Sequence, residues 1–277
     1  MPAVAASKGI SRLFNRKLYR GLASVVLFFV LWQVLASLDK LLGIDSLRST
    51  VIPPPSVVFK TWWSLLLDPN YAKSWYLSVS RVLAGFLAAV LLGIPLGLLM
   101  AVSSKFYRTV FPTFEVLRPI PPLAWVPISI IFWPTQELSI TFVTFLGAFT
   151  TIVINVIGGA KSIDMRYFQA ARSMGASNWE IFRRLILPGT IPSIAVGAEV
   201  GMGITWAVVV AAEMISGGGS SLSGAGGGLG YFVWNSYVGG VFPQIIVGMF
   251  SIGIAGYVAS SAIRKIGKLV TPWLQTR

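Results

Sequence analysis

The sequence predicts an all-α integral membrane protein with six transmembrane helices, and three features support this class. Hydrophobic residues make up 55% of the 277 residues and charged residues only 11%, whereas soluble domains carry about 25% charged residues. The mean hydropathy is +0.76. The apolar residues also form runs of about 20, the length of a membrane-spanning helix. With so few charges the chain cannot build a surface that faces water, so spanning helices are the expected unit of the fold.

Six runs are long and apolar enough to span a bilayer. They cover approximately residues 22–38, 82–103, 110–133, 138–160, 190–214 and 241–262. The first run follows a basic stretch and is either a retained helix, the interpretation that we favour, or the core of a signal peptide. The transmembrane domain is therefore expected to cover residues 21–262, and six spans place both termini on the same side.

The distribution of basic residues identifies that side as the cytoplasm. Most of the 22 Lys and Arg residues lie on the side of the termini. The segments on that side are residues 1–20, 103–109, 161–189 and 263–277. Cytoplasmic segments of membrane proteins retain Lys and Arg. We therefore expect both termini in the cytoplasm, with residues 1–20 and 263–277 as basic tails.

The composition excludes most enzyme classes. Because Cys and His are absent, thiolate nucleophiles, Cys/His zinc sites and His-based acid–base catalysis are impossible. The Gly-rich stretch from Gly217 to Gly230 does not match the G-x-G-x-x-G pattern of dinucleotide sites. We expect no catalytic residue, cofactor or metal on this chain. We also expect no nucleic-acid binding, since the net charge of +13 has an ordinary source in cytoplasmic loops.

Two segments are expected on the extracytoplasmic side. Residues 39–80 form an interfacial segment in which the three prolines at 53–55 interrupt any helix. Ser56 can then cap a short helix that runs to Leu67 and carries two tryptophans suited to the membrane interface. The second segment, residues 215–240, is a Gly-rich loop that either contacts a binding protein or serves as a plain linker.

Glycines four residues apart stand inside two spans. Gly93 and Gly97 lie in the second span, and Gly197 and Gly201 lie in the fifth. This spacing lets helix backbones approach closely. We favour packing within the chain over contact with a second subunit.

Residues 161–189, which we call the elbow, are too long for a simple connection and predict two short helices. Ser162 or Asp164 can cap the first helix, and Gly175 can adopt the left-handed conformation that ends it. The next segment opens with a capping box of the S-x-x-E type, formed by Ser177 and Glu180. We expect a second short helix to begin there.

The second helix of the elbow is expected to carry Phe182 and to end at Pro188. In the first helix, Phe168, Ala171 and Met174 recur at helical spacing and predict an apolar face outside the membrane. Such a face either folds back on the ends of the chain's own helices or binds a partner.

The third span is expected to be irregular. It contains the residues Pro119, Pro121, Pro122, Trp125 and Pro127. So many prolines cannot form a regular helix, and irregular backbone at membrane depth must face protein or a water-filled cavity. Arg118 is costly in a bilayer and can pair with Glu115 or face an anionic substrate. We favour the pair with Glu115, and the two roles do not exclude each other.

Two further acids belong to the fifth span. Glu199 is predicted inside the span, and Glu213 lies near its outer end. Ionisable residues in a span mark either a transport pathway or a paired structural site. We favour gating or helix packing over contact with substrate for both residues.

The elbow resembles the Glu-Ala-Ala loop of permease subunits in binding-protein-dependent ABC importers. The matching run is Gln169-Ala170-Ala171-Arg172-Ser173-Met174-Gly175, followed by Ile186-Leu187-Pro188. The resemblance implies the type I ABC importer permease fold, in which this loop docks on a cytoplasmic ATPase. Gln169 stands where the family usually has Glu, so a salt bridge to the ATPase is in doubt. The residues assigned to ATPase coupling are Gln169, Ala170, Ala171, Gly175, Ser177, Glu180, Phe182, Leu187 and Pro188.

Two other stretches resemble the nitrate, sulfonate, taurine and bicarbonate branch of these importers. They are Leu117-Arg118-Pro119-Ile120-Pro121-Pro122-Leu123-Ala124-Trp125 and Val210-Ala211-Ala212-Glu213-Met214. The pathway or gate residues that we select are Glu115, Arg118, Pro119, Pro121, Pro122, Trp125, Glu199 and Glu213. Where this chain has Ala198 and Glu199, the branch more often has Leu-Arg, which weakens a specific assignment to nitrate or sulfonate.

The resemblance implies a multi-pass subunit of the bacterial inner (plasma) membrane that imports a small anion. Its expected partners are a second permease subunit, as a homodimer, a dimeric ABC ATPase that holds ATP and Mg, an extracytoplasmic solute-binding protein and the lipid bilayer. A self-sufficient channel or secondary carrier is the alternative, and it predicts transport by this chain alone. An intramembrane enzyme is the weakest alternative because no suitable pair of reactive residues stands out.

Overall fold

The computed structural model describes residues 19–37, 52–217 and 227–274 of the chain. Every regular element within these ranges is a helix, which confirms the predicted all-α class. Five of these helices are long and apolar enough to cross a membrane, and a bent pair of helices can form a sixth span. The described residues belong to two compact units.

The first unit contains residues up to Asp68 together with Ser236–Val247. Its apolar helix Tyr19–Ser37 corresponds to the predicted first span. A second helix, α2, covers Pro55–Leu65. Of the predicted interfacial segment, residues 39–51 lie outside the described part of the chain.

The start of α2 differs from the prediction. Pro54 is the N-cap, Pro55 is the first helical residue, and no side chain caps the helix. Proline suits this position because its fixed φ is already helical and it has no N–H to satisfy. Ser56 is therefore not the cap, and its backbone N–H donates instead to the side-chain oxygen of Gln33 at 3.1 Å.

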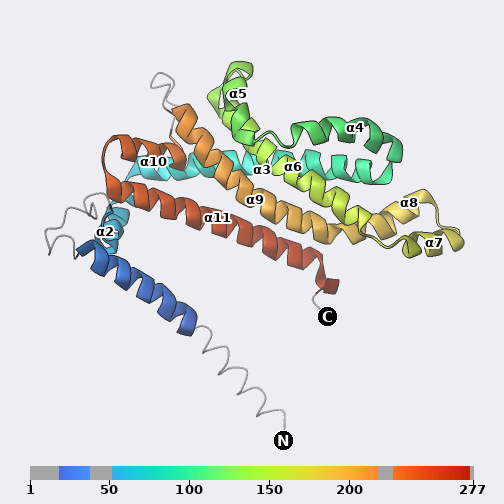
Figure 1. The fold of residues 1–277 in the computed structure, drawn as a ribbon, viewed down its shortest axis with the longest axis horizontal. Helices are drawn as coiled ribbons and strands as arrows, with labels where there is room; N and C mark the ends of the chain where they lie inside the picture. Colours follow the sequence, from blue (N-terminus) through green and yellow to red (C-terminus); the bar gives the residue numbers. More distant parts are fainter. Residues whose placement is uncertain (1–18, 38–51, 218–226, 275–277) are drawn as a thin grey trace, which may run out of the picture. The chain divides into compact units, whose positions relative to one another are not determined.

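The second unit is built around three long helices: α3 (Pro69–Val102), α6 (Gln136–Lys161) and α9 (Leu187–Gly217). Helix α6 packs against both α3 and α9, and its valines and isoleucines at the contact are fully buried. Figure 1 shows residues 248–270 of α11 (Phe242–Val270), the part of this helix that belongs to the second unit, running beside α9. These helices carry the candidate sites described below.

Both glycine pairs face α6. A Cβ on Gly97 would lie 2.7 Å from Cβ of Val156, and a Cβ on Gly197 would lie 2.6 Å from Cβ of Asn155. Neither position has room for a side chain, so the glycines allow close helix packing. The favoured interpretation, packing within the chain, is confirmed.

Several helices extend beyond the predicted spans. Helix α3 begins at Pro69, so the last part of the predicted interfacial segment belongs to it. Helix α11 continues to Val270, into the predicted cytoplasmic tail. The predicted Gly-rich loop contains a further helix, α10 (Leu229–Val238). Residues 218–226 of that loop lie outside the described part of the chain. Hydropathy marks the apolar middle of a helix and misses polar turns at its ends.

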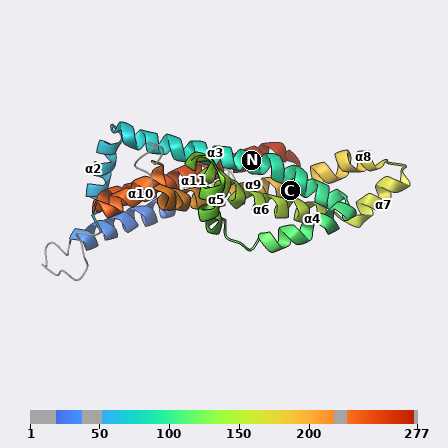
Figure 2. The same cartoon turned by 90° about the horizontal axis from the view of Figure 1, so that it is seen from above.

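The third span is broken, as the prolines predict. Helix α4 (Ser104–Leu117) is followed by a 3-10 turn (Pro122–Trp125) and by α5 (Val126–Phe132). The two helical parts are bent by 86°, and Figures 1 and 2 show α5 turned away from the direction of α4. The segment is therefore either a broken span or a re-entrant loop.

The elbow projects from one end of the second unit, where Figures 1 and 2 both show α7 and α8 beyond the other helices. Helix α7 covers Met165–Ser173, and α8 covers Asn178–Ile181. The prediction that Pro188 ends the second helix is wrong. A π-helical turn (Phe182–Ile186) joins α8 directly to α9. The wider turn accommodates Pro188, which has no N–H to donate.

Candidate functional site

The first corner of the elbow is fixed by local hydrogen bonds. Asp164, one of the two predicted caps, accepts a hydrogen bond from the backbone N–H of Arg166 at 2.9 Å. At the other end Gly175 has φ +80°, as predicted, and the backbone N–H of Ala176 donates to the carbonyl of Ala171 at 3.0 Å. This is a Schellman ending, which requires a residue that tolerates the left-handed region.

The second corner contains the predicted capping box. The backbone N–H of Glu180 donates to Oγ of Ser177 at 3.3 Å, and the backbone N–H of Ser177 donates to Oε2 of Glu180 at 2.9 Å. Both residues therefore have a structural role in starting α8. The elbow is a defined double corner with a fixed shape.

The predicted apolar face of the elbow is divided between two surroundings. Phe168 and Ala171 are half-buried and pack against a cluster that includes Ile181 and Ile186, so this part folds back on the chain. Met174 is 81% exposed. The other exposed large apolar side chains of the elbow are Met165, Tyr167 and Trp179.

The remaining coupling candidates lie around this surface. Gln169 and Ala170 are exposed on α7. Phe182, Leu187 and Pro188 are half-buried where the elbow joins α9. The exposed part of the elbow is thus a mixed apolar and polar surface at its tip, and the half-buried part is its connection to the fifth span.

The structure does not form the suggested pair between Glu115 and Arg118. Both side chains are exposed, and neither has an ion-pair partner within the described ranges. An exposed pair at this spacing gains only a few tenths of a kcal/mol, too little to hold two flexible side chains together. Pro119 and Pro121 are exposed beside Arg118. Pro122 and Trp125, in the turn that follows, are half-buried.

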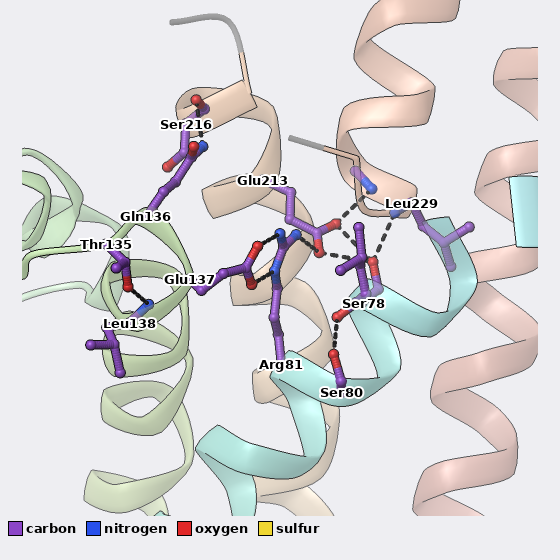
Figure 3. Close-up of polar contacts among 12 residues, drawn as sticks. Ser78, Ser80, Arg81, Thr135, Gln136, Glu137, Leu138, Glu213, Ser216 and Leu229 are labelled. Carbon is purple, nitrogen blue, oxygen red and sulfur yellow. Dashed lines mark hydrogen bonds and ion pairs between the residues drawn. The ribbon is translucent and has the colours of Figure 1, made fainter. Parts of the chain in front are cut away.

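Glu213 lies in a buried polar cluster that joins α3, α9 and α10 (Figure 3). Its carboxylate accepts hydrogen bonds from Oγ of Ser78 at 2.8 and 2.9 Å, from Nη1 of Arg81 at 2.8 Å and from the backbone N–H of Gly230 at 2.9 Å. Oγ of Ser78 also accepts from the backbone N–H of Leu229 at 2.8 Å. The first turn of α10 is thereby held to α3 and α9.

Arg81 extends this cluster to α6, as Figure 3 shows. Its Nε donates to Oε2 of Glu137 at 2.7 Å, and its Nη2 donates to Oε1 at 2.5 Å. The Arg81 side chain is 2% exposed, whereas that of Glu137 is 41% exposed. One guanidinium group therefore binds carboxylates from two helices, which is the geometry that arginine provides best.

Sequence reasoning selected Glu213 but missed Ser78, Arg81 and Glu137. Arg81 stands just before the predicted second span and Glu137 just before the fourth. Both spans were predicted to start too late, so both residues were assigned to loops. Extending each predicted span by one turn at its outer end would have placed Arg81 and Glu137 at the same membrane depth as Glu213. This agreement in depth is the signal in the sequence that could have identified the cluster.

Glu199 forms a separate contact near the middle of α9. Its Oε1 accepts a hydrogen bond from Nε of Arg264 at 2.7 Å. The Glu199 and Arg264 side chains are 32% and 48% exposed. This contact ties α9 to α11 through a single hydrogen bond, and it includes a residue that was assigned to a cytoplasmic tail.

Comparison with known proteins finds one matching family and several similar permeases. Residues 93–276 match the family described as binding-protein-dependent transport system inner membrane components. The chain is 32% identical to the nitrate import permease protein NrtB of Leptolyngbya laminosa, covering 96% of this chain and 93% of the relative. It is 27% identical to the taurine transport system permease protein TauC of Escherichia coli, covering 94% and 91%.

A solved structure shows a similar fold. A chain from a bacterial ABC transporter involved in the import of the acidic polysaccharide alginate aligns with a TM-score of 0.59 at 15% identity. The alignment covers 96% of this chain and 99% of the other. The similarity extends over nearly the whole helical arrangement.

Proposed function

The chain belongs to the binding-protein-dependent transport system inner membrane components, and we propose that it moves a small anion into the cytoplasm. It is a permease subunit of an ABC importer and not an enzyme, because ATP hydrolysis belongs to a separate subunit. The proposed cargo is of the nitrate, sulfonate, taurine or bicarbonate type. The observation that carries the choice is the full-length similarity to a nitrate permease and a taurine permease.

Arg118 supports an anionic cargo. It is exposed in the proline-rich break between α4 and α5, and it has no carboxylate partner in the described part of the chain. A guanidinium group offers several N–H donors to an oxyanion, and such charge-assisted hydrogen bonds are strong. The cycle that we propose uses this break as part of a pathway enclosed by two permease subunits, with Pro119, Pro121, Pro122 and Trp125 shaping it.

The structure of the elbow supports coupling to an ATPase. Helices α8 and α9 form one continuous helix from Asn178 to Ser216, 39 residues in length, which corresponds to roughly 60 Å. A displacement at the elbow would reach the outer end of α9 through this helix. In the proposed cycle a binding protein delivers the anion outside, and an ATPase dimer that holds ATP and Mg²⁺ moves the elbow of each permease inside.

Reconstitution tests the proposal. Vesicles that contain this chain, its ATPase and its binding protein should take up one of the four anion types only when ATP is supplied. Arg118→Gln should lower the rate about 10-fold or more, with Arg118→Lys less affected, because a charge-assisted contact is lost in the first variant only. Uptake by vesicles that contain this chain alone would favour the channel or carrier and overturn the proposal.

The elbow needs a variant that leaves the fold intact. Ala171→Asp is unsuitable because Ala171 packs against the chain's own cluster. Met174 is exposed at the tip, so Met174→Asp should abolish ATP-driven uptake while Met174→Gln, of similar length and uncharged, keeps most of it. Equal uptake by the two variants, at equal amounts in the membrane, would remove the elbow tip from the ATPase interface.

A further inference from the structure

An apolar groove lies between the last two turns of α3 and the start of α8. It has a volume of about 560 Å³ and is lined by Pro95, Leu98, Leu99, Val102, Asn178, Trp179 and Phe182. This volume lies within the range of about 300–1,000 Å³ that is typical of ligand sites. Apart from one asparagine, the lining is hydrophobic or aromatic.

The walls of the groove are open to the surroundings of the protein. Leu99 is 55% exposed, Val102 is 49% exposed and Trp179 is 66% exposed. The Trp179 ring stacks on the ring of Phe182 with centroids 5.6 Å apart, which holds one wall in place. Tryptophan prefers the boundary between hydrocarbon and headgroups, so the groove is suited to the membrane surface on the side of the elbow.

Exposed cations lie close in sequence to the residues that line both walls. Arg183 follows Phe182 directly, and Lys105 follows Val102 by three residues; both are exposed. No acid occurs from Pro69 to Phe114, and Glu180, beside Trp179, is held by the capping box. The groove is therefore an apolar slot between helices whose lining residues have exposed cations close to them in the sequence, on the side that the basic residues identify as cytoplasmic.

We propose that this groove binds an anionic membrane phospholipid. One acyl chain lies against Leu99 and Trp179, and the headgroup phosphate is bound by Arg183 and Lys105. Basic pockets between transmembrane helices on the cytoplasmic side bind anionic headgroups in this way. The bound lipid fills the space between α3 and the elbow, so it supports the position from which the elbow acts. The two exposed cations near the lining residues favour an anionic lipid over a wholly apolar occupant.

The test is lipid binding by the purified full-length chain in detergent, titrated with phosphatidylglycerol or with phosphatidylcholine and followed by native mass spectrometry. Wild type should retain phosphatidylglycerol in preference. Leu99→Trp fills the groove and should weaken phosphatidylglycerol binding about 10-fold, as expected for losing most of one buried chain's contacts. Leu91→Trp is the matched control, because Leu91 is exposed on the same helix and does not line the groove.

The charges are tested separately. Arg183→Gln and Lys105→Gln should each weaken phosphatidylglycerol binding about 5-fold and leave phosphatidylcholine unchanged, since each cation near an anionic lipid contributes about that factor. Arg172→Gln, an exposed arginine elsewhere in the elbow, should have no effect. Wild-type lipid binding by Leu99→Trp would overturn the proposal. So would loss of ATPase binding by Leu99→Trp with unchanged lipid binding, since the groove would then belong to the ATPase interface.

Discussion

Helix α9 carries two glutamates, roughly four turns apart, in opposite surroundings. The Glu213 side chain has no exposed surface and accepts hydrogen bonds from Ser78, Arg81 and Gly230. The Glu199 side chain is 32% exposed and accepts one hydrogen bond, from Arg264. Both positions were predicted as gate residues on the same grounds. The difference shows that an acidic residue in a spanning helix can either hold helices together through buried contacts or make a contact that water can replace.

The physical reason lies in desolvation. A buried carboxylate has lost its hydration and depends on every partner that replaces water, so removing one partner is costly. A half-exposed pair exchanges its contact with water at little cost. We therefore expect the outer end of α9 to stay joined to α3, α6 and α10 during transport, and the Glu199 contact with α11 to open and close.

The largest effect is expected for Arg81→Met. This change leaves Glu213 buried without its cation and should lower the free energy of unfolding by about 3–5 kcal/mol. Unfolding of the purified chain by SDS in mixed micelles measures it. The double variant Arg81→Met with Glu213→Gln should recover part of the loss, because no buried charge is then left unpaired. The other carboxylate that Arg81 binds, that of Glu137, is 41% exposed and keeps contact with water. A double variant as unstable as the sum of the two single variants would show that the two residues act independently.

Ser78→Ala is expected to cost about 1–3 kcal/mol, because it removes a donor to Glu213 and leaves the buried N–H of Leu229 without its acceptor. Ser80→Ala is the matched control on the same helix, since among the described residues the Ser80 hydroxyl bonds only to the carbonyl of Leu77. The same unfolding measurement should separate the two. Equal losses would mean that Ser78 contributes no more than a local hydrogen bond.

Gly228→Ala should destabilise the chain by about 1–3 kcal/mol, since a Cβ there would collide with the Glu213 carboxylate. Gly203→Ala, in the middle of α9 with no atom near the added Cβ, should instead stabilise by about 0.5–1 kcal/mol. Thermal unfolding of both variants in detergent gives the comparison. A neutral Gly228→Ala would show that the start of α10 can move away from Glu213.

The sequence predicted those parts of the fold that depend on local chemistry. The capping box of Ser177 and Glu180, the left-handed Gly175 and the break at the prolines all follow from constraints within a few residues. Pro188 misled the prediction because whether a proline ends a helix depends on the turn before it, and a π-helical turn is not marked by composition.

Contacts between distant residues were predicted less well. The spacing of the residues predicted the apolar face of the first elbow helix. Only packing decided that Phe168 and Ala171 turn inward while Met174 stays exposed. The partners of Glu213 and Glu199 come from other helices, and their identity depends on where each helix begins and how it rotates. Sequence spacing favoured Glu115 for Arg118 because it sees only neighbours on one helix.

The smallest effect is expected for Glu199→Gln, which should change the free energy of unfolding by no more than about 1 kcal/mol. A double-mutant cycle with Arg264→Gln isolates the contact, and its coupling energy should fall further as salt is raised, because exposed charges are screened. Glu213→Gln, on the same helix, is the reference for the loss of a buried glutamate. A coupling energy of about 3 kcal/mol or more, insensitive to salt, would make Glu199 a joint of the same kind as Glu213. Helix α9 would then be anchored near its middle as well as at its outer end, and the elbow could move it only together with α11.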